Sequence, residues 1–299
     1  MCDLILPLPK ALEYWNVSPL ECLIFFASVI VTIFTSIEVG LYVSISASLA
    51  LLLYRLARPK GEFLGQIQIQ SVDGEDSVSV PSYVPISNVG LNPTVIVEQP
   101  VPGVLIYRLG ESFTYPNASL VNDRIIAFAK EKTCPDPNAP ILSLGDRPWN
   151  ESYAPRIPQP TMSDPRPSLQ AMVFDFGGVS SMDLTAAQVL RDTCRQLDNY
   201  AGHQVEYHFA QIHSPWILRA LVAHGFGVGN PRHPLVELAS VQQPQLQNGH
   251  ADIEMAASNQ GTTVGPVVGT NYPFFHLNLE NAVKSAESAV PTALGGNNL

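Results

Sequence analysis

Charged residues are scarce in this chain of 299 residues, and the few basic ones are spread thinly. Asp, Glu, Lys and Arg make up 14% of it, against about 25% in ordinary soluble domains. The formal net charge is -10, and this acidic balance argues against nucleic-acid binding, which needs a clustered basic face. The four cysteines, at positions 2, 22, 134 and 194, have neither metal-ligand spacing nor a dense disulfide pattern. Zinc fingers and disulfide scaffolds are therefore excluded.

Charge is almost absent from residues 22–54. Residues 22–37 and 39–54 contain no charged side chain, and Glu38 alone interrupts the run. One membrane span needs about 20 residues, so the whole run is too long for a single span. We expect two short transmembrane helices with a tight turn at residues 38–40. The alternative interpretation is a buried helical hairpin of a soluble protein.

Basic residues flank this hairpin and are missing from its middle: Lys10, Arg55, Arg58 and Lys60. The positive-inside rule then places both flanks in the cytoplasm. We interpret Glu38 as a residue at the membrane interface or in a helix contact, and a role as an ion-coupling carboxylate is the less favoured alternative.

The rest of the chain divides by proline content and hydrophobic periodicity. The prolines of residues 61–103 predict an extended linker with one short strand at 66–70. Beyond it, the pattern predicts three strands and three helices in alternation. The predicted strands are 104–109, 171–176 and 205–210, and the predicted helices are 119–132, 184–200 and one that starts at Pro215 and stops at Gly225. This order is typical of an α/β sheet with right-handed crossovers.

The predicted layout has five parts. They are a cytoplasmic N-terminal segment at 1–18, a transmembrane hairpin at 19–57, a linker at 58–101, an α/β domain at 102–229 with an irregular insertion at 134–168, and a tail at 230–299. The tail is polar, and we expect most of it to be disordered. Residues 273–285 are the exception, because their apolar side chains could dock or form a short helix.

No motif in the chain supports catalysis or metal binding. Asp175 ends a predicted strand, as the nucleophile of a haloacid-dehalogenase-like phosphatase does. That chemistry usually has a second Asp where this chain has Gly177, and it needs a later Lys, although none occurs between Lys132 and Lys284. The histidines at 203, 208 and 213 do not converge as ligands. We therefore predict no catalytic, cofactor-binding or metal-binding residue.

The loop before the helix at 184–200 is the remaining candidate site. Asp183 lies where a helix N-cap belongs, and the amides behind it form a helix start that suits an anion. We weigh a plain cap against a regulatory or ligand-facing loop. The candidate regulatory residues are Ser180, Ser181, Asp183, Leu184 and Thr185.

Four stretches of the chain resemble SulP-family sulfate permeases, and in particular the fungal members of that family. Residues 17–21 with 37–43 resemble the last transmembrane hairpin, and 61–65 the exit from it. Residues 102–108 with 115–118 resemble the first strand of a STAS domain and its turn, and 145–150 also match. Residues 174–183 with the following helix resemble the STAS loop. The resemblance implies a membrane transporter of sulfate or a similar anion, whose cytoplasmic STAS domain controls folding, trafficking or activity.

Two departures from the family pattern matter. The family has many more spans than the two found here, so no substrate-binding residue can be carried over, and we expect a fragment, a truncated gene product or a partner-dependent half. The STAS loop usually reads Asp-Ser/Thr-Ser-Gly, whereas this chain has Asp, Leu, Thr and Ala at 183–186. Leu184 thus replaces the hydroxyl most often phosphorylated in bacterial relatives, and Thr185, Ser180 and Ser181 remain as acceptors.

We interpret the chain as the C-terminal regulatory part of a sulfate transporter that does not transport by itself. Its partners would be the bilayer and, at the face around residues 180–185, the transporter membrane domain or a second protomer. The alternative is a membrane-anchored STAS module that binds a nucleotide or a protein. In both cases the protein is in the membrane, with the STAS domain and both termini cytoplasmic, and no nucleic acid is bound.

Overall fold

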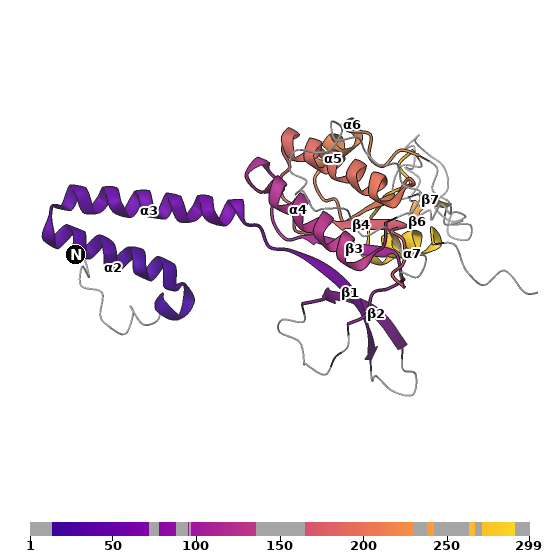
Figure 1. Ribbon diagram of the computed structural model, residues 1–299, viewed down its shortest axis with the longest axis horizontal. Helices are drawn as coiled ribbons and strands as arrows, with labels where there is room; N and C mark the ends of the chain where they lie inside the picture. Colours follow the sequence, from indigo (N-terminus) through magenta and orange to yellow (C-terminus); the bar gives the residue numbers. More distant parts are fainter. Residues whose placement is uncertain are drawn as a thin grey trace, which may run out of the picture. The chain divides into compact units, whose positions relative to one another are not determined.

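The computed structural model describes residues 14–71, 78–87, 95, 97–135, 165–229, 238–241, 263–266 and 271–290. The chain forms two compact units, Met1–Arg58 and Pro59–Leu299. Its helices are α2 (Pro19–Phe34), α3 (Ile37–Ala57), α4 (Tyr115–Lys132), α5 (Leu184–Ala201), α6 (Pro215–Ala223) and α7 (Leu279–Ser288). Its strands are β1 (Gly61–Ser71), β2 (Val78–Pro85), β3 (Val104–Leu109), β4 (Ala171–Asp175), β5 (Glu206–Ala210), β6 (Leu238–Val241), β7 (Thr263–Pro266) and β8 (Phe275–His276) (Figure 1).

The first unit is a pair of helices, α2 and α3, and the break between them falls earlier in the chain than the sequence predicted. The break falls at Thr35 and Ser36, and Glu38 lies in the first turn of α3. Two hydroxyl side chains account for this position. Thr35 Oγ1 donates to the carbonyl of Val31 at 2.7 Å, and Ser36 caps α3 by accepting from the amide of Val39 at 3.4 Å. The predicted turn at residues 38–40 is therefore wrong.

Gly40 provides a close helix contact instead of a turn. It is buried, and a Cβ atom added there would overlap the hydroxyl of Thr32 on α2. Ser28 Oγ donates to the carbonyl of Gly40 at 3.2 Å. Small and hydroxylated residues let apolar helices approach each other in this way.

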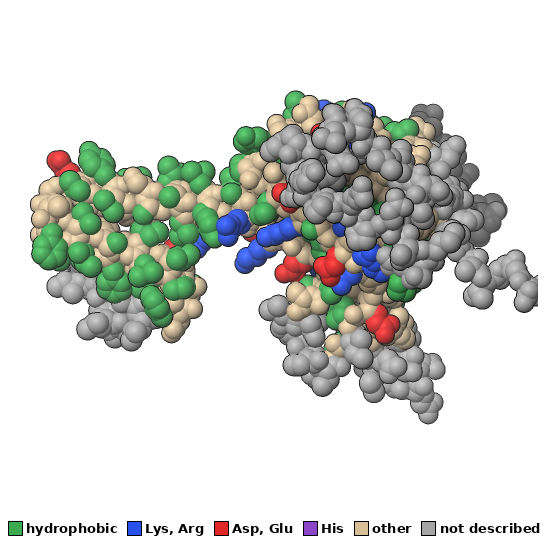
Figure 2. Space-filling model, viewed as in Figure 1, with side chains coloured by type: hydrophobic (Ala, Val, Ile, Leu, Met, Phe, Trp, Pro, Cys, Tyr) green, Lys and Arg blue, Asp and Glu red, His purple; other side chains and the backbone are tan. Residues whose placement is uncertain are grey.

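The outer surface of this hairpin is apolar. α3 has 21 residues and is long and apolar enough to cross a membrane, whereas α2 has 16 and is a shorter apolar helix. Hydrophobic side chains are spread over the visible face of both helices, among uncharged side chains and backbone (Figure 2). Ile33, Phe34 and Ile37 are each at least 72% exposed. Such a surface suits lipid or other helices rather than water.

The second unit is built on a six-stranded sheet of order β2-β1-β3-β4-β5-β8. β3, β4, β5 and β8 run parallel to one another, while β1 is antiparallel to both β2 and β3. The predicted linker at 58–101 is thus corrected. The strand expected at 66–70 exists, but it spans Gly61–Ser71 and forms a hairpin with β2 inside the sheet. Polar and apolar residues alternate from Gln66 to Gln70, which is the pattern of a strand with one buried face.

Helices cover both faces of this sheet. α4, α5 and α6 lie on one face, and α7 lies on the other (Figure 1). Alternate strand residues point to the two sides, so Leu105 and Tyr107 join the first core while Val104 and Ile106 join the second. Burial on both faces explains why these strands read as continuous apolar runs.

The part of the predicted tail that the structure describes includes a layer of the core. β8 adds to the edge of the sheet beside β5. Leu279, Ala282, Val283 and Ala286 of α7 are at most 5% exposed against the second face of the sheet. The exception expected at 273–285 is confirmed, and β6 and β7 form a separate two-stranded sheet. Other tail residues lie outside the described ranges.

The predicted strand–helix alternation is confirmed within a few residues. α4 begins at Tyr115, earlier than the predicted 119, and there the side chain of Asn117 accepts from the amide of Thr114 at 3.0 Å. α6 begins at Pro215, and Gly225 follows its cap with a φ of 83°. Residues 136–164 of the predicted insertion lie outside the described residues.

Candidate functional site

The candidate site lies at the carboxyl edge of the parallel strands. α4, α5 and α6 all begin there, after loops at residues 110–114, 176–183 and 211–214. The first two loops lie side by side, because Phe113 N donates to Ser181 O at 3.0 Å and Asp183 N donates to Phe113 O at 3.3 Å. Ser112 Oγ and Ser180 Oγ add a third link at 2.7 Å.

Asp183 holds the starts of two helices together. Its Oδ1 accepts from the amide of Ala186 at 2.7 Å, which caps α5 as the sequence predicted. Its Oδ2 accepts from the amide of Tyr115, the first residue of α4, at 2.6 Å. Both carboxylate oxygens thus face helix N-termini, where negative charge is favoured. Asp183 itself thus supplies a negative charge at both helix starts.

The other candidate residues of the loop point outward. Ser180, Ser181, Leu184 and Thr185 are exposed, and Leu184 is 67% exposed as the first residue of α5. Leu184 is an apolar contact point, whereas the hydroxyls of the others can accept a phosphate only from the solvent side. Glu38, the remaining candidate, is exposed in the first turn of α3.

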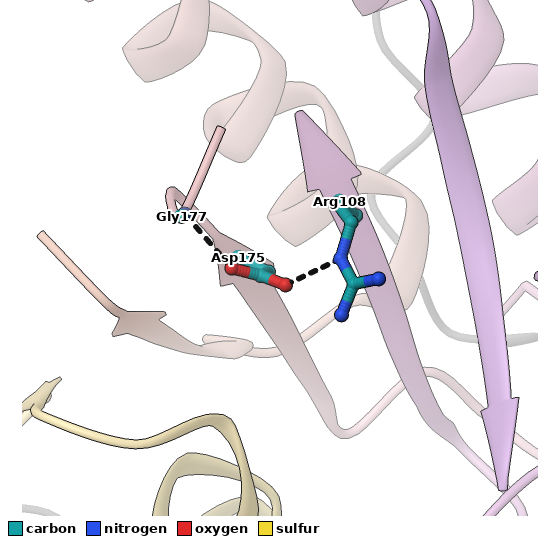
Figure 3. A network of polar contacts seen from close by, with 3 residues as sticks. All are labelled: Arg108, Asp175 and Gly177. Atoms are coloured by element: carbon teal, nitrogen blue, oxygen red, sulfur yellow. Dashed lines mark hydrogen bonds and ion pairs between the residues drawn. The ribbon is translucent and has the colours of Figure 1, made fainter. Parts of the chain in front are cut away.

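Asp175 supports the loop from inside (Figure 3). Its side chain is 1% exposed, and its Oδ2 accepts from Arg108 Nε of β3 at 2.6 Å. Its Oδ1 accepts from the amide of Gly177 at 2.9 Å. Both oxygens are thus engaged in joining β3, β4 and the turn after β4. Asp175 thus has the geometry of a structural residue.

The three histidines noted in the sequence do not gather at one point. His208 is fully buried, and its Nδ1 lies 3.1 Å from Nε2 of His276 on β8. Burial and the neighbouring His208 lower the pKa of His276 to about 3. His203 Nδ1 instead contacts the carbonyl of Ala201 at 2.9 Å. Among the described residues there is no group of three or more His, Cys, Asp or Glu side chains that could hold a metal ion.

A shallow hollow lies on the other side of α4. Its volume is about 330 Å³, and its lining includes Phe63, Tyr107, Arg124 and Phe128. The rings of Phe63 and Phe128 stack at 3.6 Å between centroids, and burial raises the pKa of Tyr107. This hollow is not lined by any of the candidate loop residues 180–185.

Sequence reasoning missed three features of the site. The Arg108–Asp175 pair, the second cap made by Asp183 and the His208–His276 contact each join residues at least 67 positions apart in the chain. Only the parallel pairing of β3 with β4 gives a signal, because it brings the ends of those two strands together.

Comparison with known proteins adds three kinds of similarity. Residues 96–215 match the model of the STAS domain. The chain is 47% identical to the probable sulfate permease C3H7.02 of Schizosaccharomyces pombe over 75% of its length, which is 26% of that relative. It is 37% identical to sulfate permease 2 of Neurospora crassa over 90% of its length and 34% of the relative. The chain therefore spans about a quarter to a third of these relatives.

Solved structures agree at the level of the fold. The murine Slc26a9 anion transporter in the inward-facing state aligns with 95% of this chain and 31% of its own, with a TM-score of 0.52 and 14% identity. A second structure of SLC26A9 gives a TM-score of 0.53 at 16% identity over 94% of this chain and 32% of its own. With the apolar hairpin, the sheet and the loop at Asp183 in the expected order, the chain carries a STAS domain and fits the C-terminal portion of a SulP-family sulfate permease.

Proposed function

We propose that the chain is the C-terminal regulatory part of a sulfate transporter. One observation carries the proposal: an apolar hairpin is followed after three residues by a STAS sheet, in a chain 47% identical to a probable sulfate permease over 75% of its length. The relatives named sulfate permease support a location in the membrane. The positive-inside rule supports a cytoplasmic STAS domain, because Arg55, Arg58 and Lys60 lie on the STAS side of α3.

The regulatory role belongs to the loop around Asp183. That carboxylate joins the starts of α4 and α5, so any partner that moves one helix start moves the other. Exposed Thr185 offers the contact, and Ser180 and Ser181 offer hydroxyls beside it. We propose that this loop meets the transporter membrane domain or a second protomer.

The two apolar helices do not transport sulfate by themselves. A path for an anion needs polar groups enclosed on all sides, and α2 and α3 supply one line of contact through Gly40 and Thr32. Glu38, exposed beside the interhelical break, suits a position at the membrane interface. We therefore assign the hairpin to anchoring and to packing against other helices.

Sulfate uptake by vesicles tests this proposal. The chain alone, reconstituted in phospholipid vesicles, should take up radiolabelled sulfate no faster than protein-free vesicles. The Schizosaccharomyces pombe relative is reconstituted in parallel, as the control that shows whether the vesicle preparation can report sulfate uptake. Protease added outside oriented vesicles should reach the STAS domain and both flanks of the hairpin from the same side. Robust uptake by the chain alone, or flanks on opposite sides, would refute the assignment.

A further inference from the structure

Helices that follow the parallel strands expose large apolar side chains where they begin. Tyr115 of α4, Leu184 of α5 and Trp216 of α6 are 71%, 67% and 74% exposed. Each is the first or second residue of its helix. Leu277, which is 53% exposed, lies between β8 and α7. Because β3, β4, β5 and β8 are parallel, these four residues lie at the same edge of the sheet, and we call them the apolar edge.

The apolar edge holds most of the large apolar side chains that the described part of the second unit exposes. The others are Ile69, Val80 and Val228. Ile69 pairs with Val80 across the β1–β2 hairpin, eight residues along β1 from Gly61, which is about 26 Å at 3.3 Å per residue. Single exposed apolar residues are ordinary, whereas several at one edge mark an interaction surface.

The chain enters the second unit at this same edge. Gly61, the first residue of β1, pairs with Leu109, the last residue of β3. The carbonyl of Lys60 accepts from the amide of Gly110, in the loop before α4, at 3.0 Å. α3 ends at Ala57, so three residues, with a reach of about 10 Å, tether the apolar edge to the end of α3. This step rests on the proposed function, because it requires that α3 crosses the bilayer.

The chemistry of the edge matches the surface of a bilayer. Tyr and Trp have an apolar ring with a polar tip, and they are enriched where headgroups meet acyl chains. The guanidinium of Arg219 lies 4.9 Å from the centroid of the Trp216 ring, which places a cation beside the indole. The N-termini of α4, α5, α6 and α7 also face this edge with partial positive charge, which Asp183 offsets at α4 and α5.

We propose that the apolar edge rests in the phospholipid headgroup region of the bilayer that holds α3. The STAS unit is then held against the membrane at two places, by the three-residue tether and by the apolar edge. This contact fixes which face of the STAS unit the membrane covers. It uses Leu184 of the loop and leaves the exposed Ser180, Ser181 and Thr185 for the membrane domain or a second protomer.

Fluorescence quenching by brominated phospholipids tests the contact. The full chain carries Trp15→Phe and Trp149→Phe, so Trp216 is the one remaining tryptophan. It is reconstituted in phosphatidylcholine–phosphatidylserine vesicles brominated near the top or near the end of the acyl chains. We expect top bromination to remove about half of the emission, and end bromination much less, because interfacial side chains lie roughly 5–10 Å into the headgroup boundary. Adding Leu184→Ser should weaken the quenching.

Two variants separate this inference from the proposed function. Both also carry Trp216→Phe, and circular dichroism checks that each is folded. Leu49→Trp, on an exposed position of α3, reports insertion of the hairpin. Val80→Trp should not be quenched, because the Ile69–Val80 pair, which we call the control pair, lies away from the apolar edge.

The outcomes divide cleanly. Quenching of Trp216 and of Leu49→Trp, without quenching of Val80→Trp, supports the contact. Quenching of Leu49→Trp without Trp216 overturns the inference and leaves the membrane hairpin standing, whereas no quenching of Leu49→Trp overturns both. Equal quenching of Val80→Trp, or a Trp216 signal that disappears when the protein is diluted in lipid, also overturns it, the latter in favour of contact with a second copy.

Discussion

At the scale of single residues, Asp183 accounts for how two helix starts and two loops form one structure. Its oxygens accept from the amides of Tyr115 and Ala186, so one carboxylate satisfies an unpaired donor on each helix. The sequence predicts Asp183 as the N-cap of one helix. In the structure its side chain also links α4 to α5, two helices that are separated by 51 residues of chain.

Replacing Asp183 should therefore cost more than the loss of an ordinary cap. We expect Asp183→Ala to lower the free energy of unfolding of the STAS unit by about 2 kcal/mol, roughly 1 for each helix. Asp183→Asn keeps one oxygen acceptor and should cost about half as much. Urea unfolding of the chain in detergent measures the difference. Asp192→Ala, on an exposed position of the same helix, is the matched control, and equal effects for Asp183→Ala and Asp192→Ala would contradict the double cap.

His276 makes the attachment of β8 and α7 sensitive to acid. Its pKa is lowered to about 3 from 6.5 by burial and by His208, and Glu206 lies 3.6 Å from the other nitrogen of His208. The opened segment binds a proton that the docked one excludes, so docking is strongest above about pH 6.5 and weakens as the pH falls towards 3.

Hydrogen exchange measures this effect. After correction for the intrinsic exchange rate, amides of α7 should exchange about 20-fold faster at pH 5 than at pH 7. Amides of α4 serve as the internal control. His276→Gln should abolish the acceleration, and an equal acceleration in α4 and α7 would show that His276 is not its cause.

At the scale of elements, the α2–α3 hairpin depends on one close contact. A side chain at Gly40 would overlap the hydroxyl of Thr32, so Gly40→Leu must separate the helices. We expect it to destabilise the hairpin by about 1–3 kcal/mol. Titration with SDS in mixed micelles, followed by circular dichroism, gives the midpoint. Ala50→Leu adds similar bulk on an exposed part of α3, and a midpoint lowered equally by both variants would rule out the contact.

α7 should be as necessary to the sheet as the three helices on the opposite face. Val283 is fully buried and belongs to the core that includes Ile106 and Val173. Val283→Asp would bury an unpaired charge, so we expect about 3 kcal/mol or more of destabilisation and exposure of that face. Binding of a hydrophobic dye reports the exposure. Lys284→Gln, next to it and exposed, should leave dye binding unchanged, and no dye binding by Val283→Asp would contradict the role of α7.

Periodicity predicted the elements whose burial follows a regular pattern. The strands at 104–109 and 171–176 and the helix at 184–200 agree with the structure within a few residues, because each buries a face that repeats along the sequence. β1 was predicted only in part, at 66–70, whereas β2 was hidden by Pro81 and Pro85, which an edge strand tolerates. The interhelical break was misplaced because Gly40 is used for packing. At the site, the cap at Asp183 was predictable, whereas its second partner Tyr115 depends on how the sheet brings two loops together.

At the scale of the whole molecule, we propose that the hairpin anchors the chain and that the STAS unit controls transport. Residues 22–54 of the hairpin contain one charged residue, Glu38. The STAS unit begins three residues after α3, and Leu184 is exposed at the start of α5. We expect changes in the STAS unit to alter the rate of transport through contacts made by the apolar edge.

Sulfate uptake by a chimera tests that claim most directly. The C-terminal portion of the Schizosaccharomyces pombe relative is replaced by this chain, and uptake is measured at equal amounts in the membrane. Leu184→Glu should lower uptake by about fivefold or more without unfolding the domain, because an acidic residue is favoured in the first turn of a helix. Ile69→Glu, on the distant control pair, should leave uptake unchanged. Uptake that is the same for Leu184→Glu, Ile69→Glu and the parent chimera would contradict a regulatory role for the loop.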